Sequence, residues 1–372
     1  MIPVCEPTLN GNELKYVTEC VKSGWVSSSG KFINQFEDKF SEYCGVSHGV
    51  SCSSGTTAIH LAIEAMGIGR GDEVIIPTFT MIGSCNAVIY AGAKPVLVDS
   101  ELETWNIDVN KIEEKITKKT KAIMVVHTYG HPVDMDKIKK TSGKYNIPII
   151  EDAAEAHGAE YKGKKTGGLG DIACFSFYAN KIITSGEGGM VVTNNKKWAK
   201  NASLLRNHFF GEPRFLHQKV GYNYRLTNLQ AAIGLAQLEK IDYYVKCRRD
   251  NASNYNKLLS KVKGITTPPE AKWAKNVYWM YGVLVQDEFG ISMQELRQKL
   301  AKSGIDTRTF FIGMHKQPVY KGKDERFPDI SGKYPVADEL ERKGCYLPSS
   351  SHLTKEEIVK IVDAIKTIKG KN

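Results

Sequence analysis

Between about residues 50 and 200, short apolar runs of strand length alternate with segments of helical periodicity. The apolar runs, rich in valine and isoleucine, are EVIIPTFT, KPVLVDS, AIMVVHTYG, IPIIED, DIACFSFY and GMVVTN. The helical patterns between them include SGTTAIHLAIEAMG and VDMDKIKKTSGKYN. Strands that alternate with helices form a mostly parallel sheet with helices on both faces. The sequence therefore predicts an α/β fold whose ligands bind beyond the carboxyl ends of the strands.

The chain of 372 residues is longer than the roughly 250 to 300 residues at which one hydrophobic core stops growing, so we expect two domains. One long helix is predicted over about residues 227 to 262, and the prolines of the TTPPEAKW segment that follows cannot continue it. Strand-like VYWMYGVLV and two helices with capping boxes, at Ser292 and Thr354, predict a smaller C-terminal α/β lobe. We therefore divide the chain into a large domain, residues 1–262, which begins with a helical segment, and a small domain, residues 263–372.

The composition, with 41% hydrophobic and 25% charged residues, is that of an ordinary globular protein. The N-terminal sequence has no basic segment followed by an apolar one, and no uncharged apolar run approaches the length of a membrane span. The eight cysteines form no CxxC pair and no cluster with histidine, which favours reduced thiols over a metal site. We therefore expect a cytoplasmic protein with no membrane anchor and no bound metal.

The net charge of +10 favours an acidic partner. The lysines are dispersed, and the densest cluster, residues 137–140, is short and lacks the interleaved aromatic residues of nucleic-acid-binding surfaces. A phosphorylated small molecule fits the charge equally well, and the charge alone does not choose between the two.

Lys181 follows the apolar and aromatic segment CFSFYAN and precedes Gly186, Gly188 and Gly189. A buried amine is costly unless it is paired or neutralised. A desolvated lysine loses its proton readily and can form a Schiff base. The sequence context thus distinguishes Lys181 from the surface lysines and makes it a candidate catalytic residue.

Two further features follow predicted strands. Residues 53–57 open a helix with serines, a glycine and threonines, which suits a phosphate, although plain N-capping by serine explains the same pattern. Asp152 ends the run IPIIED, where it can pair with a protonated ring nitrogen or cap a helix. Together with Lys181, these features describe a site for pyridoxal 5′-phosphate (PLP). No GxGxxG follows a first strand and there is no GxxxxGK[ST], which disfavours dinucleotide and P-loop nucleotide binding.

Four long motifs occur in order along the chain: SSGTTAIHLA, IEDAAEAHGAEYKGKKTGGLGD, FSFYANKIITSGEGGMVVTN and GYNYRLTNLQAAIGLAQLEKID. Through them, and over nearly its whole length, the chain resembles the PLP-dependent nucleotide-sugar aminotransferases, which have the aspartate aminotransferase fold (fold type I). Within that family it is most similar to the perosamine-forming enzymes, which aminate C4 of a GDP-linked 4-keto-6-deoxy sugar. UDP- or dTDP-linked 4-keto-6-deoxyglucose, aminated to viosamine, is the alternative. The resemblance implies glutamate as amino donor and makes residues 1–262 the PLP-binding domain.

The resemblance also implies roles for individual residues. Lys181 takes the position of the lysine that binds PLP covalently, and Asp152 that of the partner of the ring nitrogen. The other implied cofactor contacts are Gly55, Thr56 and Ser176 at the phosphate, Glu155 near the ring hydroxyl, Met81 over the ring, and Asn223 at the phosphate of the neighbouring subunit's cofactor. The contact from Asn223 implies a homodimer with shared active sites. Relatives that dehydrate C3 of the sugar carry histidine in place of the lysine, so Lys181 favours transamination.

The chain departs from the family's pattern at two positions. Met81 stands where relatives commonly have an aromatic residue, and its thioether can still pack against an aromatic ring. Gly313 replaces a usual proline ahead of His315, which changes the expected shape of a substrate loop. Trp25, Ser28 and His315 are the implied contacts to the nucleotide-diphospho-sugar, with a core position for Trp25 and a surface position for His315 as the alternatives.

Two other functions remain as alternatives. Some relatives are regulators, so the chain could be a non-catalytic PLP-binding protein, but the intact set of Lys181, Asp152, Ser176 and Asn223 argues against that reading. A nucleic-acid binder is favoured by charge alone, and we expect neither nucleic acid nor membrane as a partner.

Overall fold

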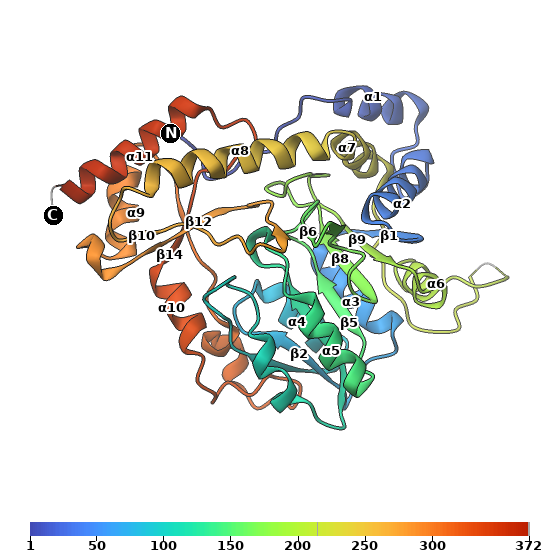
Figure 1. Ribbon diagram of the computed structural model, residues 1–372. Coiled ribbons are helices and arrows are strands. Elements are labelled where there is room, and N and C mark those ends of the chain that lie inside the picture. The colour runs from blue at the N-terminus through green and yellow to red at the C-terminus, as the bar shows by residue number, and fades with distance from the viewer. Residues whose placement is uncertain (214, 371–372) are drawn as a thin grey trace.

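The computed structural model describes residues 1–213 and 215–370, and a seven-stranded sheet lies at its centre (Figure 1). The strands are β1 (His48–Cys52), β2 (Glu73–Pro77), β3 (Lys94–Val98), β4 (Thr120–Val126), β5 (Ile149–Asp152), β8 (Ile172–Ser176) and β9 (Gly189–Thr193). Their order is β1-β9-β8-β5-β4-β2-β3. Strand β9 is antiparallel to both of its neighbours, and the other pairs are parallel. The predicted mostly parallel sheet is thus confirmed.

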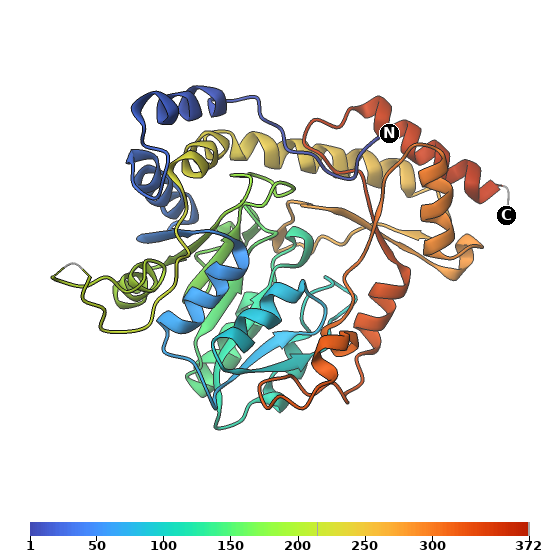
Figure 2. The same ribbon diagram turned by 180° about the vertical axis from the view of Figure 1, so that it is seen from behind.

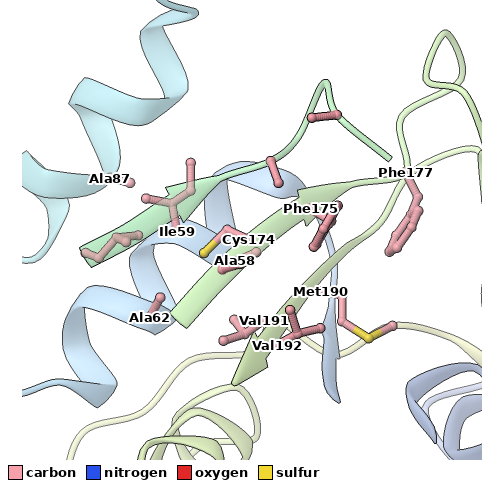
Figure 3. Packing of buried hydrophobic residues seen from close by; sticks show 14 of the residues in the cluster. Ala58, Ile59, Ala62, Ala87, Cys174, Phe175, Phe177, Met190, Val191 and Val192 are labelled. Atoms are coloured by element: carbon pink, nitrogen blue, oxygen red, sulfur yellow. The ribbon is translucent and has the colours of Figure 1, made fainter. Parts of the chain in front are cut away.

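Helices cover both faces of this sheet (Figure 2). Helices α3 (Gly55–Ala65) and α4 (Ile82–Tyr90) pack on one face and α5 (Met135–Tyr145) on the other. Side chains of β4 alternate between these two faces. Ala122 and Met124 pack in the core with α3 and α4, whereas Ile123 and Val125 pack in the core with α5. Both faces of the strand are therefore apolar, as the continuous apolar runs predict. Figure 3 shows α3, with Ala58, Ile59 and Ala62, lying against β8 and β9.

The helix predicted over residues 227 to 262 is two helices, α7 (Asn228–Leu238) and α8 (Ile241–Leu259), so that prediction is wrong at Glu239 and Lys240. Neither glycine nor proline marks the break, and composition therefore carries no signal of it. Tertiary contacts form there instead, because side chains of residues 10–16 hydrogen bond to both Glu239 and Lys240. Helix α7 packs against α1 (Glu13–Ser23) and α2 (Lys31–Cys44), and α6 (Lys196–Leu205) packs against β1 and β9.

A second, antiparallel sheet lies in the C-terminal part of the chain. Its strands, in the order β10-β12-β14-β13, are β10 (Ile265–Thr266), β12 (Tyr281–Val285), β14 (Gly344–Leu347) and β13 (Arg308–Thr309). The helices there are α9 (Met293–Lys302), α10 (Pro335–Lys343) and α11 (Lys355–Gly370). The predicted capping boxes at Ser292 and Thr354 are confirmed at the starts of α9 and α11. A three-stranded sheet is formed by β11 (Ala274–Lys275), β6 (Glu160–Tyr161) and β7 (Lys164–Lys165).

Helix α8 joins the two parts of the chain. Its first half contributes Tyr244 and Val245 to the core of the large sheet, and its second half contributes Tyr255 and Leu259 to the core beside the small sheet. Because one helix serves both cores, the domain boundary at residue 262 remains a prediction. None of the helices in the described residues is both long and apolar enough to cross a membrane.

Candidate active site

Strands β1, β2, β5 and β8 end at the same edge of the central sheet, and the predicted site residues follow these ends. Contacts between the strand ends and the first turns of α3 and α4 bring the residues together at this edge. The Ser84 hydroxyl donates to Asp152 Oδ2 over 2.7 Å, and a Cβ atom on Gly55 would lie 2.7 Å from the Cβ atom of Ser176. The charge of Lys181 acts on Asp152. One edge of the central sheet therefore holds the features that the sequence places at separate strand ends.

The N-terminus of α3 combines a serine cap with an open backbone edge. Ser54 Oγ accepts a hydrogen bond from Thr57 N–H over 3.2 Å, so the plain N-cap is present. The neighbouring glycine lets the backbone approach Ser176, and any side chain at position 55 would fill the space between them. The first N–H groups of a helix have no acceptor within the helix and suit a phosphate. Gly55, Thr56 and Ser176 thus fit the phosphate of PLP.

Asp152 is buried at the end of β5 without a cationic hydrogen-bond partner among the described residues. Burial raises the pKa of its carboxyl group, and hydrogen bonds from Ser84 and from Ala154 N–H partly oppose the shift. A protonated ring nitrogen would offset the cost of ionising this buried carboxylate. The position of Asp152 therefore fits the pyridinium nitrogen of PLP.

Glu155 and Lys181 lie close to Asp152 and influence each other's ionisation. Burial raises the pKa of Glu155 to about 7, although the charge of Lys181 and a 2.7 Å hydrogen bond from Tyr129 N–H oppose the shift. Burial lowers the pKa of the Lys181 amine, and the charges of Glu155 and Asp152 oppose that shift. Perturbed ionisation of neighbouring groups in a cleft is typical of catalytic sites. A lysine with a lowered pKa is closer to its nucleophilic, uncharged form.

A buried pair behind Asp152, His127 with Glu151, has no role in the sequence-based predictions. The two side chains are fully buried, and His127 Nε2 lies 3.0 Å from Glu151 Oε2. Because Val133 N–H donates to Nδ1, the ring proton is on Nε2 and is donated to Glu151. The carboxylate also accepts from the N–H groups of residues 167, 169 and 170. Adjacent strand residues face opposite ways, so the Glu-Asp sequence itself signals one site carboxylate and one supporting carboxylate.

The remaining predicted site residues differ in exposure. Met81 caps α4, accepts from Gly83 N–H through its sulfur and is 50% exposed, which leaves it open to a ligand. Trp25 is 58% exposed, so the alternative of a core position is wrong. Ser28 lines a cleft of about 780 Å³ together with Lys200 and Arg225.

The side chain of His315 is held by contacts with other protein groups. Its side chain is 9% exposed, and its ring nitrogens contact Thr78 Oγ1 at 2.8 Å and Asp338 Oδ1 at 3.0 Å. The ring also packs on Tyr334, with centroids 4.5 Å apart. This arrangement favours an anchoring role over direct contact with substrate. Because the side chain is nearly buried, the alternative of a surface position for His315 is wrong as well.

Asn223 is exposed, and the residues before and after it, Tyr222 and Tyr224, stack their rings on each other with centroids 4.8 Å apart. The Tyr222 hydroxyl donates to Glu64 over 3.2 Å, and the Tyr224 hydroxyl lies 3.3 Å from His60 Nδ1. Both partners belong to α3, so the tyrosines face that helix and Asn223 faces away from it. The predicted contact with a neighbouring subunit stays a prediction, and this orientation is compatible with it.

Comparison with known proteins gives a consistent family. The sequence profile of the DegT/DnrJ/EryC1/StrS aminotransferase family matches residues 7–366. A GDP-perosamine synthase of Escherichia coli O157:H7 is 45% identical over 365 residues, which are 98% of this chain and 97% of the relative. The structure of DesV from S. venezuelae superimposes with a TM-score of 0.89 at 33% identity, over 96% of this chain and 94% of that one. The PLP form of Spr1654 from Streptococcus pneumoniae has a TM-score of 0.90 at 27% identity and covers 100% and 99%.

These relatives confirm the predicted fold, that of the PLP-dependent aminotransferases, and identify PLP as the cofactor. The carboxyl edge of the central sheet carries residues that fit the phosphate and the ring nitrogen of that cofactor, with a lysine of lowered pKa beside them. The chain is thus a PLP-dependent sugar-nucleotide aminotransferase, and it belongs to the DegT/DnrJ/EryC1/StrS aminotransferase family.

Proposed function

We propose that the enzyme converts a nucleotide-linked 4-keto-6-deoxy sugar to its 4-amino-4,6-dideoxy product with glutamate as the amino donor. GDP-4-keto-6-deoxymannose is the substrate that we place first, because the E. coli relative of 45% identity is a GDP-perosamine synthase. UDP- or dTDP-4-keto-6-deoxyglucose is the alternative. The observation that carries the proposal is the amine of Lys181 beside Asp152 and Glu155, since a lysine is required for transamination at this position.

PLP, when bound, supplies an aldehyde that links to amines and a ring that withdraws electrons from the carbon next to the linked nitrogen. Lys181 would bind it covalently, and the Nζ atom of the free amine would take the proton from the Cα of the amino donor. Asp152 would keep the ring nitrogen of PLP protonated. Glu155 would face its ring hydroxyl, and Gly55, Thr56 and Ser176 would hold its phosphate. The fits described above support the assignments of Asp152 and of the phosphate residues, and the closeness of Glu155 to Lys181 and Asp152 supports its assignment.

The substrate side of the site is proposed from the cleft that contains Ser28. Lys200 and Arg225 line the same cleft and carry the positive charge that a pyrophosphate needs. Trp25, three residues before Ser28, is exposed. Its ring offers a face to the sugar or the base. His315 is better assigned to anchoring the loop than to binding substrate, because its ring nitrogens have protein partners.

The enzyme is proposed to act as a homodimer in the cytoplasm. Asn223 is exposed and turned away from the helix that carries its own subunit's phosphate site, which supports a role in a neighbouring site. The eight cysteines, all free thiols in the structure, support a reducing compartment.

The test is product formation. Purified protein is incubated with PLP, glutamate and each of the three 4-keto sugar nucleotides, and the products are identified by mass. We expect amino-sugar nucleotide from the GDP sugar with ping-pong initial velocities, and none from a Lys181→Ala variant. Product only from the UDP or dTDP sugar would select the alternative substrate. Absence of product from all three sugars, with PLP bound, would favour the non-catalytic PLP-binding protein instead.

A further inference from the structure

Trp279 is a buried side chain at the edge of the site that the sequence-based predictions leave without a role. It is 5% exposed. Its indole N–H donates to the carbonyl oxygen of Asn180 over 2.8 Å. Its backbone N–H donates to Tyr129 O over 3.0 Å, and its carbonyl oxygen accepts from Arg248 over 2.7 Å. One hydrogen bond therefore fixes the ring, and two others fix the backbone that carries it.

The fixed ring lies under the amine of Lys181. The Nζ atom is 3.6 Å from the centroid of the Trp279 ring. In the described part of the chain this amine makes no ion pair with a carboxylate, although Asp152 and Glu155 act on it through their charges. The face of an indole ring carries partial negative charge and attracts an ammonium group, most strongly where water is excluded.

The same residue also fixes the backbone on which Lys181 is carried, because Asn180 directly precedes it. Tyr129 links the opposite side of the site, since its N–H donates to Glu155 while its carbonyl accepts from Trp279. Tyr129 adopts a left-handed backbone conformation with φ 54°, which is uncommon for a residue other than glycine. One constrained residue, Tyr129, thus holds both Trp279 and Glu155, and each of these two acts on the amine of Lys181.

We propose that Trp279 is a positioning residue whose indole face holds the Lys181 amine at the reaction centre whenever the amine is not bonded to the cofactor. This proposal rests on the proposed function. During transamination the freed amine accepts the proton that leaves the donor's Cα, becomes an ammonium, and returns that proton to the cofactor within the same half-reaction. A long, flexible side chain does this efficiently only if its mobility is restricted. The ring restricts the amine and favours its charged form at the moment when it carries the extra proton.

Several groups besides the ring act on the ionisation of this amine. Burial lowers the pKa of Lys181, whereas the charges of Glu155, Asp152 and Cys5 raise it. His157, whose own pKa burial lowers to about 3, is uncharged at neutral pH and adds no charge. The Trp279 ring adds to the groups that favour the charged amine and so opposes the effect of burial. If the ring is removed, the pKa of the Lys181 amine therefore falls further.

The experiment compares Trp279→Leu, which removes the ring, with Trp279→Phe, which keeps a smaller ring face and loses the N–H donor. The first measurement is the pH dependence of amine labelling at Lys181, followed by mass spectrometry in the full chain freed of cofactor. We expect Trp279→Leu to lower the labelling pKa by about one unit and Trp279→Phe to leave it within a few tenths. The second measurement is steady-state kinetics, in which Trp279→Leu lowers kcat about tenfold with KM values nearly unchanged, while Trp279→Phe restores most of kcat.

Trp105→Leu is the matched control, because Trp105 is also buried and packs on Phe310, with centroids 5.2 Å apart, in the same aromatic cluster. It should lower thermal stability without moving the labelling pKa of Lys181. The proposal is overturned if Trp279→Leu leaves that pKa unchanged, or if Trp105→Leu shifts it equally. The proposed function has its own test, because it fails if the unaltered enzyme makes no amino sugar. The labelling measurement does not depend on turnover, so the two failures can be told apart.

Discussion

The ring of His315 occupies the space that a side chain on residue 313 would need. A Cβ atom on Gly313 would lie 2.5 Å from Cε1 of His315, closer than real Cβ contacts come. The ring is held there by Thr78, which lies just beyond the end of β2, and by Asp338 of α10. Glycine at position 313 therefore permits a link between the strand end leading to Met81 and the C-terminal lobe.

Gly313→Ala should displace the His315 ring and weaken both of its contacts. Because a hydrogen bond contributes about 1 kcal/mol and one to a charged group about 1.5 to 3 kcal/mol, we expect the free energy of unfolding to fall by about 2 kcal/mol. Urea denaturation at fixed protein concentration measures the change. Gly143→Ala is the control, since position 143 lies within α5 with open space around it, and alanine there should stabilise the helix. Equal stabilities of Gly313→Ala and the unaltered chain would contradict the steric explanation.

Glu155→Gln tests the buried carboxyl group beside Lys181. Its ordinary pKa of about 4.5 is raised by burial to about 7 in the folded chain. Between these values the folded chain keeps a proton that the unfolded chain has released, so the free energy of unfolding falls as pH rises. Glutamine cannot ionise and keeps an oxygen for the N–H of Tyr129, so the variant escapes this loss.

The stability difference in favour of Glu155→Gln should therefore grow from pH 4.5 to pH 7 and then level off, at about 3 kcal/mol by the relation of ~1.4 kcal/mol per pKa unit. Urea denaturation of the cofactor-free chain over this pH range provides the measurement. Glu295→Gln, at an exposed carboxylate whose pKa is lowered by hydrogen bonds from Ser292, should show no such gain. A pH-independent difference would mean that Glu155 ionises normally.

His127→Ala should destabilise the chain strongly, because it leaves the fully buried Glu151 without one of its donors and Val133 N–H without an acceptor. Removing one partner of a buried pair costs about 3 to 5 kcal/mol. Although burial raises the pKa of Glu151, its hydrogen bonds from His127 and the backbone lower it overall, so the carboxylate stabilises the fold above its ordinary pKa and loses this effect on acidification.

The variant should therefore also unfold at a higher pH during acid titration. Chemical denaturation and acid titration measure the two effects, with His48→Ala at the partly exposed start of β1 as the control. A loss no larger than that of His48→Ala would show that the pair is not a supporting element of the site.

The sequence predicts the parts of this molecule that depend on local pattern. Continuous apolar runs identify the strands, and because parallel strands end at one edge, the positions of Asp152 and Lys181 follow from their place after those runs. The break at Glu239 was not predictable in this way, since it depends on contacts with residues more than 200 positions away. The same holds for His315, whose partners Thr78 and Asp338 come from distant segments. Trp279 looks like an ordinary core residue until its ring is seen beneath the amine of Lys181.

Asn223 provides the sharpest test of shared active sites. Its neighbours Tyr222 and Tyr224 bind α3, and the asparagine itself is exposed on the other side of the segment. If it contacts the cofactor phosphate of the neighbouring subunit, Asn223→Ala should weaken PLP binding about tenfold or more, as expected for a lost hydrogen bond to a charged group. Reconstitution of the cofactor-free variant with PLP, followed by absorbance, measures this affinity.

Mixed dimers then decide which subunit's site the residue serves. A dimer of one Lys181→Ala chain and one Asn223→Ala chain has a complete site only if Asn223 acts across the interface, because the intact lysine then meets the asparagine of the other chain. Such mixed dimers should recover close to half of the activity of the unaltered dimer, whereas the Lys181→Ala homodimer is inactive and the Asn223→Ala homodimer binds PLP weakly. Recovery no greater than that of the Asn223→Ala homodimer would place the residue in its own subunit's site, and the exposed position between the two tyrosines would then need another explanation.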